Sequence, residues 1–186
     1  MKKRAVVTGV GHYLPKRIVH NSEFEKTLNT SDEWIVTRSG IRQRHFSNKD
    51  ETTSKMAIMA GQQAIKNANL EASDIDAIIL ATSTADFTFP SAATMVQAGL
   101  GMKSGFAYDV QAVCAGFIYA MSTANAQIIS GQANRILVIG SETFSNLMDW
   151  NDRSTCVLFG DGAGAVVLEA YSLSLIHISE PTRLEP

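Results

Sequence analysis

Short runs of apolar, often β-branched residues recur along the chain, and each is of a length typical of a strand. They cover residues 5–10, 77–81, 106–110, 136–139 and 165–168. Nearly every position in these runs is apolar, where a half-buried strand would alternate apolar and polar residues. We therefore expect strands that are covered on both faces, as in a mainly parallel sheet.

Helical patterns fill the segments between the apolar runs. Alanines at 57, 60, 64 and 68 form one small-residue stripe at helical spacing, with Thr53 as the expected cap, and this stripe predicts close packing. The other expected helices are one opened by a capping box of Ser22 and Glu25, residues 32–38 stopped by Gly40, a helix from Pro90 and Ser91 to near Gly99, and residues 114–130 with Gly131 as C-terminal cap. The alternation of strands and helices predicts an α/β fold.

The last part of the sequence departs from this pattern. We assign residues 1–171 to one domain and expect residues 172–186, SLSLIHISEPTRLEP, to be a foreign or unstructured tail. That run is similar to translated sequencing-adapter read-through and carries two prolines with no following element. A native terminal strand followed by a tail is the alternative.

Composition and charge exclude several classes of protein. Hydrophobic residues make up 45% and charged residues 18%, a balance typical of globular proteins. Sixteen Lys and Arg against eighteen Asp and Glu give a net charge of −2, so no overall basic field exists to attract nucleic acid or an anionic membrane. The sequence contains no uninterrupted apolar run long enough for a transmembrane helix, and Thr8, Gly9 and Gly11 interrupt the only candidate signal segment.

The two cysteines are the residues with the clearest chemical potential. Cys114 and Cys156 are far apart in sequence and form no metal-binding or CxxC pattern, which argues against zinc or a disulfide scaffold and favours the cytoplasm. Cys114 lies in DVQAVCAGF, where a strand is expected to end and a helix to begin. The positive end of a helix dipole stabilises a thiolate, so Cys114 is the candidate nucleophile, although a small buried residue is the alternative. We expect Cys156 to be buried.

One glycine-rich segment invites a different interpretation. FGDGAGA, residues 159–165, has no Lys-Ser/Thr pair and precedes an apolar strand run, so it does not fit a phosphate-binding loop and predicts a tight backbone turn. The sequence also contains no G-x-S-x-G elbow, the motif that carries the nucleophile of many serine hydrolases, which argues against that class of enzyme.

Several motifs together resemble the amino-terminal half of the β-ketoacyl-acyl carrier protein synthase III family. They are GVGHYLP, TSDEWIVTRSGIRQRH, ATSTADFTFPSAA, DVQAVCAGF and DRSTCVLFGDGAGAVVL, in the family's order and spacing. The resemblance implies a thiolase-like fold, of which this chain would be the amino-terminal half of a pseudo-duplicated, five-layer α-β-α-β-α architecture. Without the second half, a large apolar face should be exposed.

The resemblance also implies roles for individual residues. Cys114 would accept the acyl group, and Trp34 and Arg38, four residues apart, would meet the nucleotide part of coenzyme A together with Arg153. The remaining substrate-binding positions implied are Thr30, and Phe89, Phe144 and Phe159 around the acyl pocket. Separately, Arg42, Arg44, His45 and Lys49 form a basic patch that could meet a phosphate or an acidic carrier protein, or else be a solvated loop.

The implied reaction condenses an acyl-CoA starter with malonyl-acyl carrier protein, with loss of carbon dioxide, through an acyl-cysteine. It needs no metal or other cofactor, and the intact protein would be a homodimer whose catalytic histidine and asparagine lie in the second half. This chain alone is then expected to be inactive. Two alternatives remain: a starter-unit condensing enzyme of polyketide or related secondary metabolism, and a non-catalytic chain that only associates with itself.

Overall fold

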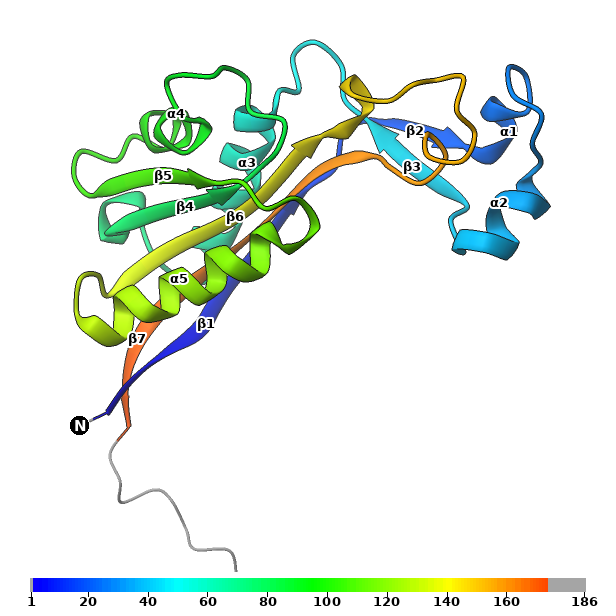
Figure 1. Ribbon diagram of the computed structural model, residues 1–186. Helices are drawn as coiled ribbons and strands as arrows, with labels where there is room; N and C mark the ends of the chain where they lie inside the picture. Colours follow the sequence, from blue (N-terminus) through cyan, green and yellow to red (C-terminus); the bar gives the residue numbers. More distant parts are fainter. Residues whose placement is uncertain (1, 174–186) are drawn as a thin grey trace, which may run out of the picture.

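The computed structural model describes residues 2–173 and consists of a five-stranded sheet with helices on both faces and a small hairpin unit to one side (Figure 1). The sheet has the strand order β1-β7-β6-β4-β5. Its strands are β1 (Lys2–Tyr13), β4 (Ala77–Ala81), β5 (Phe106–Val110), β6 (Arg135–Thr143) and β7 (Asp161–Leu173). One face carries α3 (Thr53–Asn67) and α4 (Ala92–Gly99), and the other carries α5 (Gly116–Ser130).

The hairpin unit precedes α3 in the chain. It contains β2 (Arg17–His20), α1 (Asn21–Phe24), α2 (Asp32–Ser39) and β3 (Gln43–Phe46), and β2 pairs with β3 in an antiparallel ladder. Three short 3₁₀ turns complete the described elements: η1 (Ala72–Asp74), η2 (Val113–Ala115) and η3 (Phe144–Asn146). All five apolar runs of the sequence lie within strands of the large sheet, so their assignment as strands is confirmed.

The expectation of a mainly parallel sheet is wrong only for β7: the other four strands of the sheet run in one direction, and β7 runs against them. β4 is parallel to β5 and β6, but β7 is antiparallel to both β6 and β1. A parallel neighbour requires a crossover that returns the chain to the opposite end of the sheet, usually a helix. The segment between β6 and β7 contains only η3 and irregular chain, and β7 re-enters the sheet at the edge where β6 left it.

The predicted turn at residues 159–165 is also wrong. β7 begins at Asp161, and Gly162 and Ala163 pair with Glu142 and Ser141 of β6. A side chain on Gly162 would lie 3.2 Å from the Leu14 side chain. The glycine-rich run is therefore the start of a strand that has close neighbours, and β7 continues through Leu173, two residues beyond the expected domain boundary. Residues 174–186, the rest of the predicted tail, lie outside the described part of the chain.

Burial on both faces explains the continuous apolar runs. All five residues of β4 are buried, with Ile78 and Leu80 in the core under α3 and α4, and with Ala77, Ile79 and Ala81 in the core under α5. Because successive strand residues point to opposite faces, a strand between two helical layers needs apolar side chains at every position. The expectation of burial on both faces is confirmed for β4 and for residues 136–139 of β6, but it is wrong for β5, in which no residue is buried, and for β1, whose Val7 and Val10 are exposed.

The alanine stripe of α3 packs directly on β1. Ala57, Ala60 and Ala64 are fully buried, and a Cβ added to Gly9 or Gly11 of β1 would lie 2.1 Å from a backbone oxygen of α3. No real Cβ tolerates that distance, so both β1 positions require glycine. The close packing predicted from the stripe is confirmed, and it depends on a second set of small residues in the strand.

Helix ends agree with the sequence in part. Ser91 caps α4 by accepting a hydrogen bond from the Thr94 N–H, and Gly40 and Gly131 end α2 and α5 with φ of 74° and 80°, as expected. At α3, however, Thr52 is the N-cap, and the Thr53 hydroxyl donates to the Thr84 carbonyl at 2.6 Å.

The capping box expected at Ser22 and Glu25 is absent. His20 occupies the N-cap position of α1 without a side-chain hydrogen bond. The Glu25 carboxylate accepts from the backbone N–H of Asp32 at 2.7 Å instead, so it supports the start of α2 rather than that of its own helix. The Glu25 carboxylate therefore makes a hydrogen bond to α2 in place of the expected capping bond within α1.

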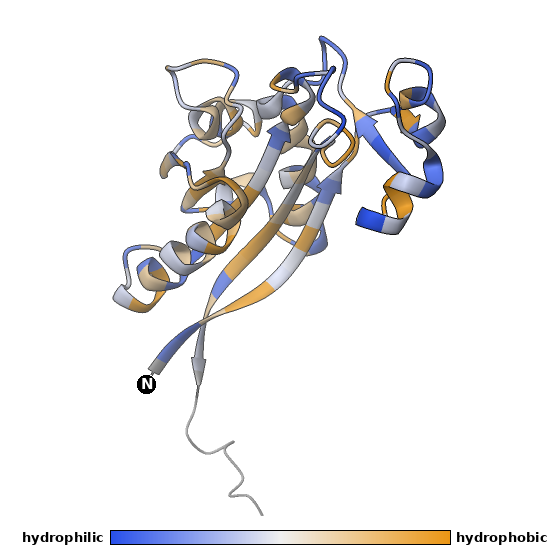
Figure 2. Ribbon diagram, turned by 45° about the vertical axis from the view of Figure 1, so that its right-hand side comes forward, coloured by the Kyte–Doolittle hydropathy of each residue, from blue (hydrophilic) through white to orange (hydrophobic). Residues whose placement is uncertain are grey.

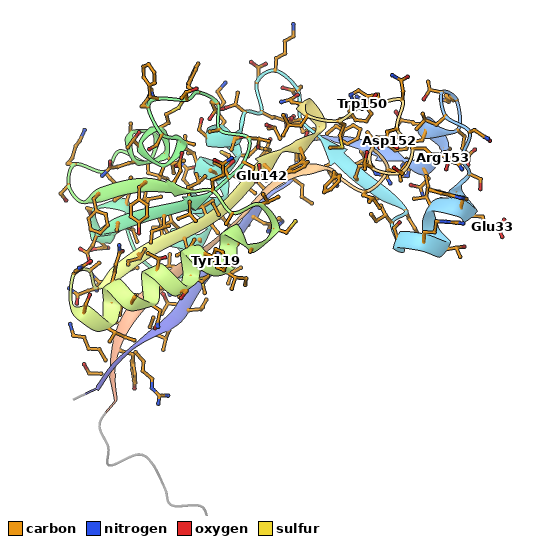
Figure 3. All side chains as sticks on the ribbon, viewed as in Figure 1. Glu33, Tyr119, Glu142, Trp150, Asp152 and Arg153 are labelled. Carbon is orange, nitrogen blue, oxygen red and sulfur yellow. The ribbon has the colours of Figure 1, made fainter. Side chains whose placement is uncertain are left out.

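An apolar surface is exposed on the α5 side of the molecule, as expected for half of the implied fold. Ile118, Tyr119 and Ile129 of α5 are exposed, and Figure 3 shows Tyr119 on this helix. Val7 and Val10 of β1 are exposed on the same face of the sheet, since they pair with Leu168 and Val166, which belong to the core under α5. Figure 2 shows hydrophobic residues concentrated in the large sheet and hydrophilic ones in the β2–β3 hairpin.

Glu51 is a buried carboxylate that joins three segments ahead of α3. It is only 8% exposed, and it accepts hydrogen bonds from the Tyr13 hydroxyl at 2.8 Å, the Lys16 N–H at 3.1 Å and the Asn48 N–H at 3.1 Å. Burial by itself raises the pKa of Glu51, but these hydrogen bonds to the charged form outweigh it and hold the pKa below the usual 4.5.

A lowered pKa in the folded state means that ionised Glu51 stabilises the fold above its ordinary pKa and that this contribution is lost as the pH falls through the lower folded value. We expect Glu51→Gln to lower the free energy of unfolding at pH 7 by about 1–3 kcal/mol. As the pH falls from 7 to below 4.5, the variant should lose less stability than the original chain. Urea unfolding across this range measures both, with the exposed Glu33→Gln as control, and equal pH dependence in all three chains would contradict the prediction.

Candidate functional site

The candidate site lies at the edge of the sheet where the parallel strands β4, β5 and β6 end. The connections β4–α4, β5–α5 and β6–β7 all leave from this edge, and the hairpin unit lies beyond it (Figure 1). In α/β sheets, ligands bind outside the carboxyl ends of parallel strands, where loops are free to carry chemical groups. Every site residue expected from the sequence lies in these connections or in the hairpin unit and the segments joined to it.

Cys114 is an exposed thiol within η2, between the end of β5 and the start of α5. The sequence placed the helix start at Cys114, whereas α5 begins at Gly116. A Cβ on Gly116 would lie 3.2 Å from the Ala81 side chain, so the start of α5 approaches the end of β4 closely. Ala115 is the N-cap and offers no capping side chain. The Ala115 N–H donates to the Ala112 carbonyl at 3.0 Å and the Gly116 N–H donates to the Val113 carbonyl, so η2 leads directly into the first turn of α5.

Cys156 is buried, as expected. Burial raises the pKa of its thiol, and the nearby Asp152 carboxylate raises it further. A buried thiol that resists ionisation is a poor nucleophile. Of the two cysteines, Cys114 is exposed and Cys156 is buried.

The backbone at Val113 is strained. Its φ is 46°, a value that β-branched residues almost never adopt, and it directly precedes Cys114. Strain of this kind persists where surrounding structure imposes it, and it is common at functional sites. Here the chain must turn from β5 into α5 within a few residues. The sequence analysis missed this feature, because Val113 carries no local signal for a positive φ.

Glu142 holds the start of the β4–α4 connection. Its carboxylate, labelled at the sheet edge in Figure 3, accepts hydrogen bonds from the Ser83 N–H at 2.8 Å, from the Thr82 hydroxyl at 3.3 Å and from the Thr84 hydroxyl. The Thr84 hydroxyl oxygen in turn accepts from the Thr143 N–H at 2.8 Å. These bonds fix the base of the loop that carries Phe89. The sequence analysis missed Glu142, because its partners are about 60 residues away in the chain.

The aromatic residues expected around an acyl pocket fall into two groups. Phe144 and Phe159 stack on each other, with ring centroids 4.7 Å apart and an interplanar angle of 19°. Asp161 braces this pair by accepting from the Ser145 N–H at 2.8 Å and from the Ser47 N–H at 2.7 Å. Phe89 is 83% exposed on the separate β4–α4 loop, so this chain brings together two of the three expected residues.

Trp34, Arg38 and Arg153 lie together in one cluster. This proximity is needed if all three are to contact the nucleotide part of coenzyme A, as the sequence resemblance implies. The Arg38 guanidinium lies 4.4 Å from the centre of the Trp34 ring, and that of Arg153 lies 5.0 Å from it. Ser31 caps α2, which places Trp34 and Arg38 one turn apart. Arg153, labelled in Figure 3, reaches this helix from the β6–β7 connection and donates to the Asn29 carbonyl. Thr30, next in the chain, has a buried hydroxyl with no hydrogen-bond partner.

The expected basic patch is not a continuous surface. Arg44 is only 6% exposed and donates to the carbonyls of Val19 at 3.4 Å and Val157 at 2.9 Å. The two-residue period of β3 turns Arg44 and Phe46 inward, and Gln43 and His45 lie on the opposite face. Arg42 precedes the strand and is exposed. Arg44 is therefore a structural cation and cannot meet a phosphate or a carrier protein.

Within residues 2–173, no group of three or more His, Cys, Asp or Glu side chains is arranged to hold a metal ion. In the same range, no helix has the length and hydropathy needed to cross a membrane.

Replacing Val113 by glycine should relieve backbone strain. Strain at such a position costs about 1–3 kcal/mol, whereas a glycine loses about 0.5–1 kcal/mol through the greater entropy of the unfolded chain. We therefore expect Val113→Gly to raise the free energy of unfolding by about 1 kcal/mol, measured by urea denaturation. Val10 is equally exposed at 58% but lies in a regular strand, so Val10→Gly should lower stability. Equal losses in both variants would refute the strain at Val113.

Comparison with known proteins agrees with this geometry. The sequence profile of the family described as 3-oxoacyl-[acyl-carrier-protein (ACP)] synthase III matches residues 108–179. The chain is 72% identical over 170 residues to β-ketoacyl-[acyl-carrier-protein] synthase III of Roseobacter denitrificans, covering 91% of this chain and 53% of that protein. The corresponding protein of Ruegeria sp. is 71% identical over 170 residues.

Solved structures give the same result. The crystal structure of 3-oxoacyl-[acyl-carrier-protein] synthase III from Aquifex aeolicus superimposes with a TM-score of 0.87 at 50% identity, covering 89% of this chain and 53% of that one. The priming β-ketosynthase of the R1128 polyketide pathway superimposes with a TM-score of 0.89 at 35% identity, covering 92% of this chain and 52% of that one. The chain spans about half the length of the curated relatives it matches, and over that length it belongs to the β-ketoacyl-acyl carrier protein synthase III family.

Proposed function

We propose that this chain carries the nucleophile and the coenzyme-binding residues of an enzyme that condenses an acyl-CoA starter with malonyl-acyl carrier protein to initiate fatty acid synthesis. The observation that carries the proposal is the exposed Cys114 thiol at the junction of β5 and α5, within a chain 72% identical to a β-ketoacyl-acyl carrier protein synthase III. The chemistry requires an accessible thiol, and Cys114 is the accessible one of the two cysteines.

The proposed reaction has two half-reactions. In the first, the Cys114 thiolate attacks the thioester carbonyl of acyl-CoA, a new carbon–sulfur bond forms, the bond to the coenzyme sulfur breaks, and coenzyme A leaves as a thiolate that takes a proton from water. In the second, malonyl-acyl carrier protein loses carbon dioxide, and the resulting carbanion attacks the acyl-cysteine. The carbon–sulfur bond to Cys114 then breaks, which releases a β-ketoacyl product and regenerates the thiolate. No metal or other cofactor takes part.

The nucleotide part of coenzyme A would bind at Trp34, Arg38 and Arg153. A flat base stacked between an indole and a guanidinium needs a spacing of about 7 Å, twice the ordinary contact distance between carbon atoms. The Arg153 guanidinium is 5.0 Å from the Trp34 ring centre, so it has to move away by about 2 Å to admit a base. Arg153 is exposed, which allows this movement.

The acyl group would meet Phe144 and Phe159 at the end of the sheet. Their stacked rings form a flat apolar surface that suits a short acyl chain. The exposed Phe89 would complete the pocket of the partner subunit in a homodimer. Its aromatic ring, which is exposed in this chain, would then be buried against apolar residues of the partner. Assembly as a cytoplasmic homodimer is part of the same proposal.

The histidine and asparagine that assist condensation would come from a second half of the intact protein. The relatives are about twice as long as the matched region, since this chain covers 53% of the Roseobacter denitrificans protein. The exposed α5 surface is where such a half would pack. On this basis, the chain alone should bind coenzyme A but should not turn over.

A second candidate is the priming enzyme of a polyketide pathway. The priming β-ketosynthase of the R1128 pathway has a TM-score of 0.89 with this chain, which is as high as that of the fatty acid enzymes. The starter acyl group distinguishes the two functions, so rates for acyl-CoA substrates of increasing length would decide between them. The simplest further alternative, a chain that only self-associates, rests on the exposed apolar surface and predicts no coenzyme binding.

Coenzyme A should bind to this chain at the arginine and tryptophan cluster. Isothermal titration calorimetry with coenzyme A is expected to show binding that Arg153→Ala weakens about tenfold, because a stacked cation contributes about 1–2 kcal/mol. Lys103→Ala removes an exposed positive charge elsewhere and should leave the affinity unchanged within about twofold. Equal losses in both variants would show a general charge effect and no cluster-specific site.

Acetyl-CoA should label Cys114 covalently in the intact protein. Radiolabelled acetyl-CoA is expected to leave one acyl group on the peptide that contains Cys114, and Cys114→Ala should abolish this label, because the thiol is the acceptor. Cys156→Ala is the matched control and should keep the label, since the Cys156 thiol is buried. A label that persists in Cys114→Ala would refute the proposed nucleophile.

A further inference from the structure

The β6–β7 connection that carries Arg153 is held against the hairpin unit by an aromatic cluster. The Trp150 ring stacks on Phe24 with centroids 6.5 Å apart and an interplanar angle of 23°, and it meets the edge of Phe46 at 5.2 Å and 71°. Figure 3 shows Trp150, Asp152 and Arg153 together on the side of the molecule where the hairpin unit lies. Trp150 lies three residues before Arg153, so its aromatic contacts anchor the connection on that side of the arginine.

A second anchor holds the same connection on the other side of Arg153. The Arg44 guanidinium donates to the Val157 carbonyl at 2.9 Å and lies 4.7 Å from the centre of the Phe24 ring. Phe24 therefore contacts both anchors: Trp150 stacks on it, and Arg44 lies over its ring. The Arg17 guanidinium lies 5.8 Å from the Phe46 ring, so each aromatic residue under Trp150 also has a cation beside it.

The short segment between the two anchors is a turn with its own hydrogen bonds. The Asp152 carboxylate accepts from the Ser154 hydroxyl at 2.5 Å, from the Thr155 hydroxyl at 2.7 Å and from the Ser154 N–H at 2.9 Å, and these bonds lower the pKa of Asp152. The Cys156 N–H donates to the Asp152 carbonyl at 3.0 Å. The backbone of Arg153 is thus held on both sides while its side chain is exposed.

We propose that Trp150 is a positioning residue for Arg153: its packing on Phe24 and Phe46 fixes the turn so that the guanidinium lies over Trp34 and over a nucleotide bound there. The ligand class rests on the proposed function. The position of Arg153 in the unliganded chain does not. Trp150 touches no substrate in this scheme, and its 43% exposed ring contributes through the backbone it holds.

A merely structural role for Trp150 predicts different results. If the role is only structural, loss of this partly exposed aromatic contact would lower the free energy of unfolding, and it would weaken ligand binding whether or not Arg153 is present. A positioning role predicts that removal of Trp150 matters only while Arg153 is present, because the two residues act as one unit. The combination of Trp150→Ala and Arg153→Ala separates the two roles.

Calorimetric titration of this chain with coenzyme A and with adenosine 3′,5′-diphosphate tests the proposal. Trp150→Ala is expected to weaken both ligands about five- to tenfold, and Trp150→Phe, which keeps an aromatic ring, should restore most of the affinity. The double variant should bind no more weakly than Arg153→Ala alone. Leu147→Ala truncates another exposed apolar side chain of the same connection and should change affinity less than about twofold.

Two results would overturn the proposal. One is unchanged affinity in folded Trp150→Ala, and the other is a further loss in the double variant relative to Arg153→Ala. If Trp150→Ala does not fold, as judged by circular dichroism, Trp150→Leu takes its place, since it keeps apolar volume without a ring. Trp150→Leu is expected to bind both ligands with the same reduced affinities as Trp150→Ala.

A readout without ligand distinguishes failure of this inference from failure of the proposed function. The side-chain protons of Arg153 lie near the Trp34 ring and should show ring-current shifts in the NMR spectrum of the unliganded chain. These shifts should move toward free-arginine values in Trp150→Ala and persist in Trp150→Phe. Unchanged shifts in Trp150→Ala would overturn the positioning role, whether or not coenzyme A binds.

Discussion

Burial of both faces of one sheet is the constraint on which the rest of the structure depends. β4 and β6 lie between α3 and α4 on one face and α5 on the other, and both strands contribute apolar residues to each of the two cores. On the first face, α3 approaches so closely that Gly9 and Gly11 cannot carry a side chain. Rigid packing of this kind fixes where each strand ends, and the candidate site consists of the connections that leave those ends.

Three carboxylates hold the loops at this edge of the sheet in defined positions. Asp109 of β5 accepts from the N–H groups of Ala92 and Ala93 at 2.9 and 2.7 Å, which ties the start of α4 to the strand before Cys114. Glu142 holds the base of the β4–α4 loop, and Asp161 braces the segment next to Phe144. Each bond joins a charged acceptor to backbone donors that would otherwise be unpaired, and such bonds are stronger than neutral ones. The connections are thereby ordered without regular secondary structure.

The hairpin unit adds a second, separately packed part of the site. Its core consists of Val19, Phe24, Ile35, Phe46, Cys156 and Val157. The last two residues belong to the β6–β7 connection, so Arg153 and the helix that carries Trp34 share one small core although they are more than a hundred residues apart. Arg44 crosses this core and bonds to the carbonyls of Val19 and Val157. The geometry of the proposed nucleotide site therefore depends on the packing of this unit, in addition to the three residues that would touch the ligand.

The sequence by itself determined the elements whose signals are local. Continuous apolar runs identified all five strands of the sheet, Ser91, Gly40 and Gly131 marked helix ends, and the motifs around Cys114 and Trp34 predicted the site residues and the family. The tertiary structure alone decided the direction of β7, the inward position of Arg44, the strained φ of Val113 and the partners of Glu142 and Trp150. Those features arise from contacts between segments distant in the chain, and no periodicity or capping pattern in a single segment encodes a contact of that kind.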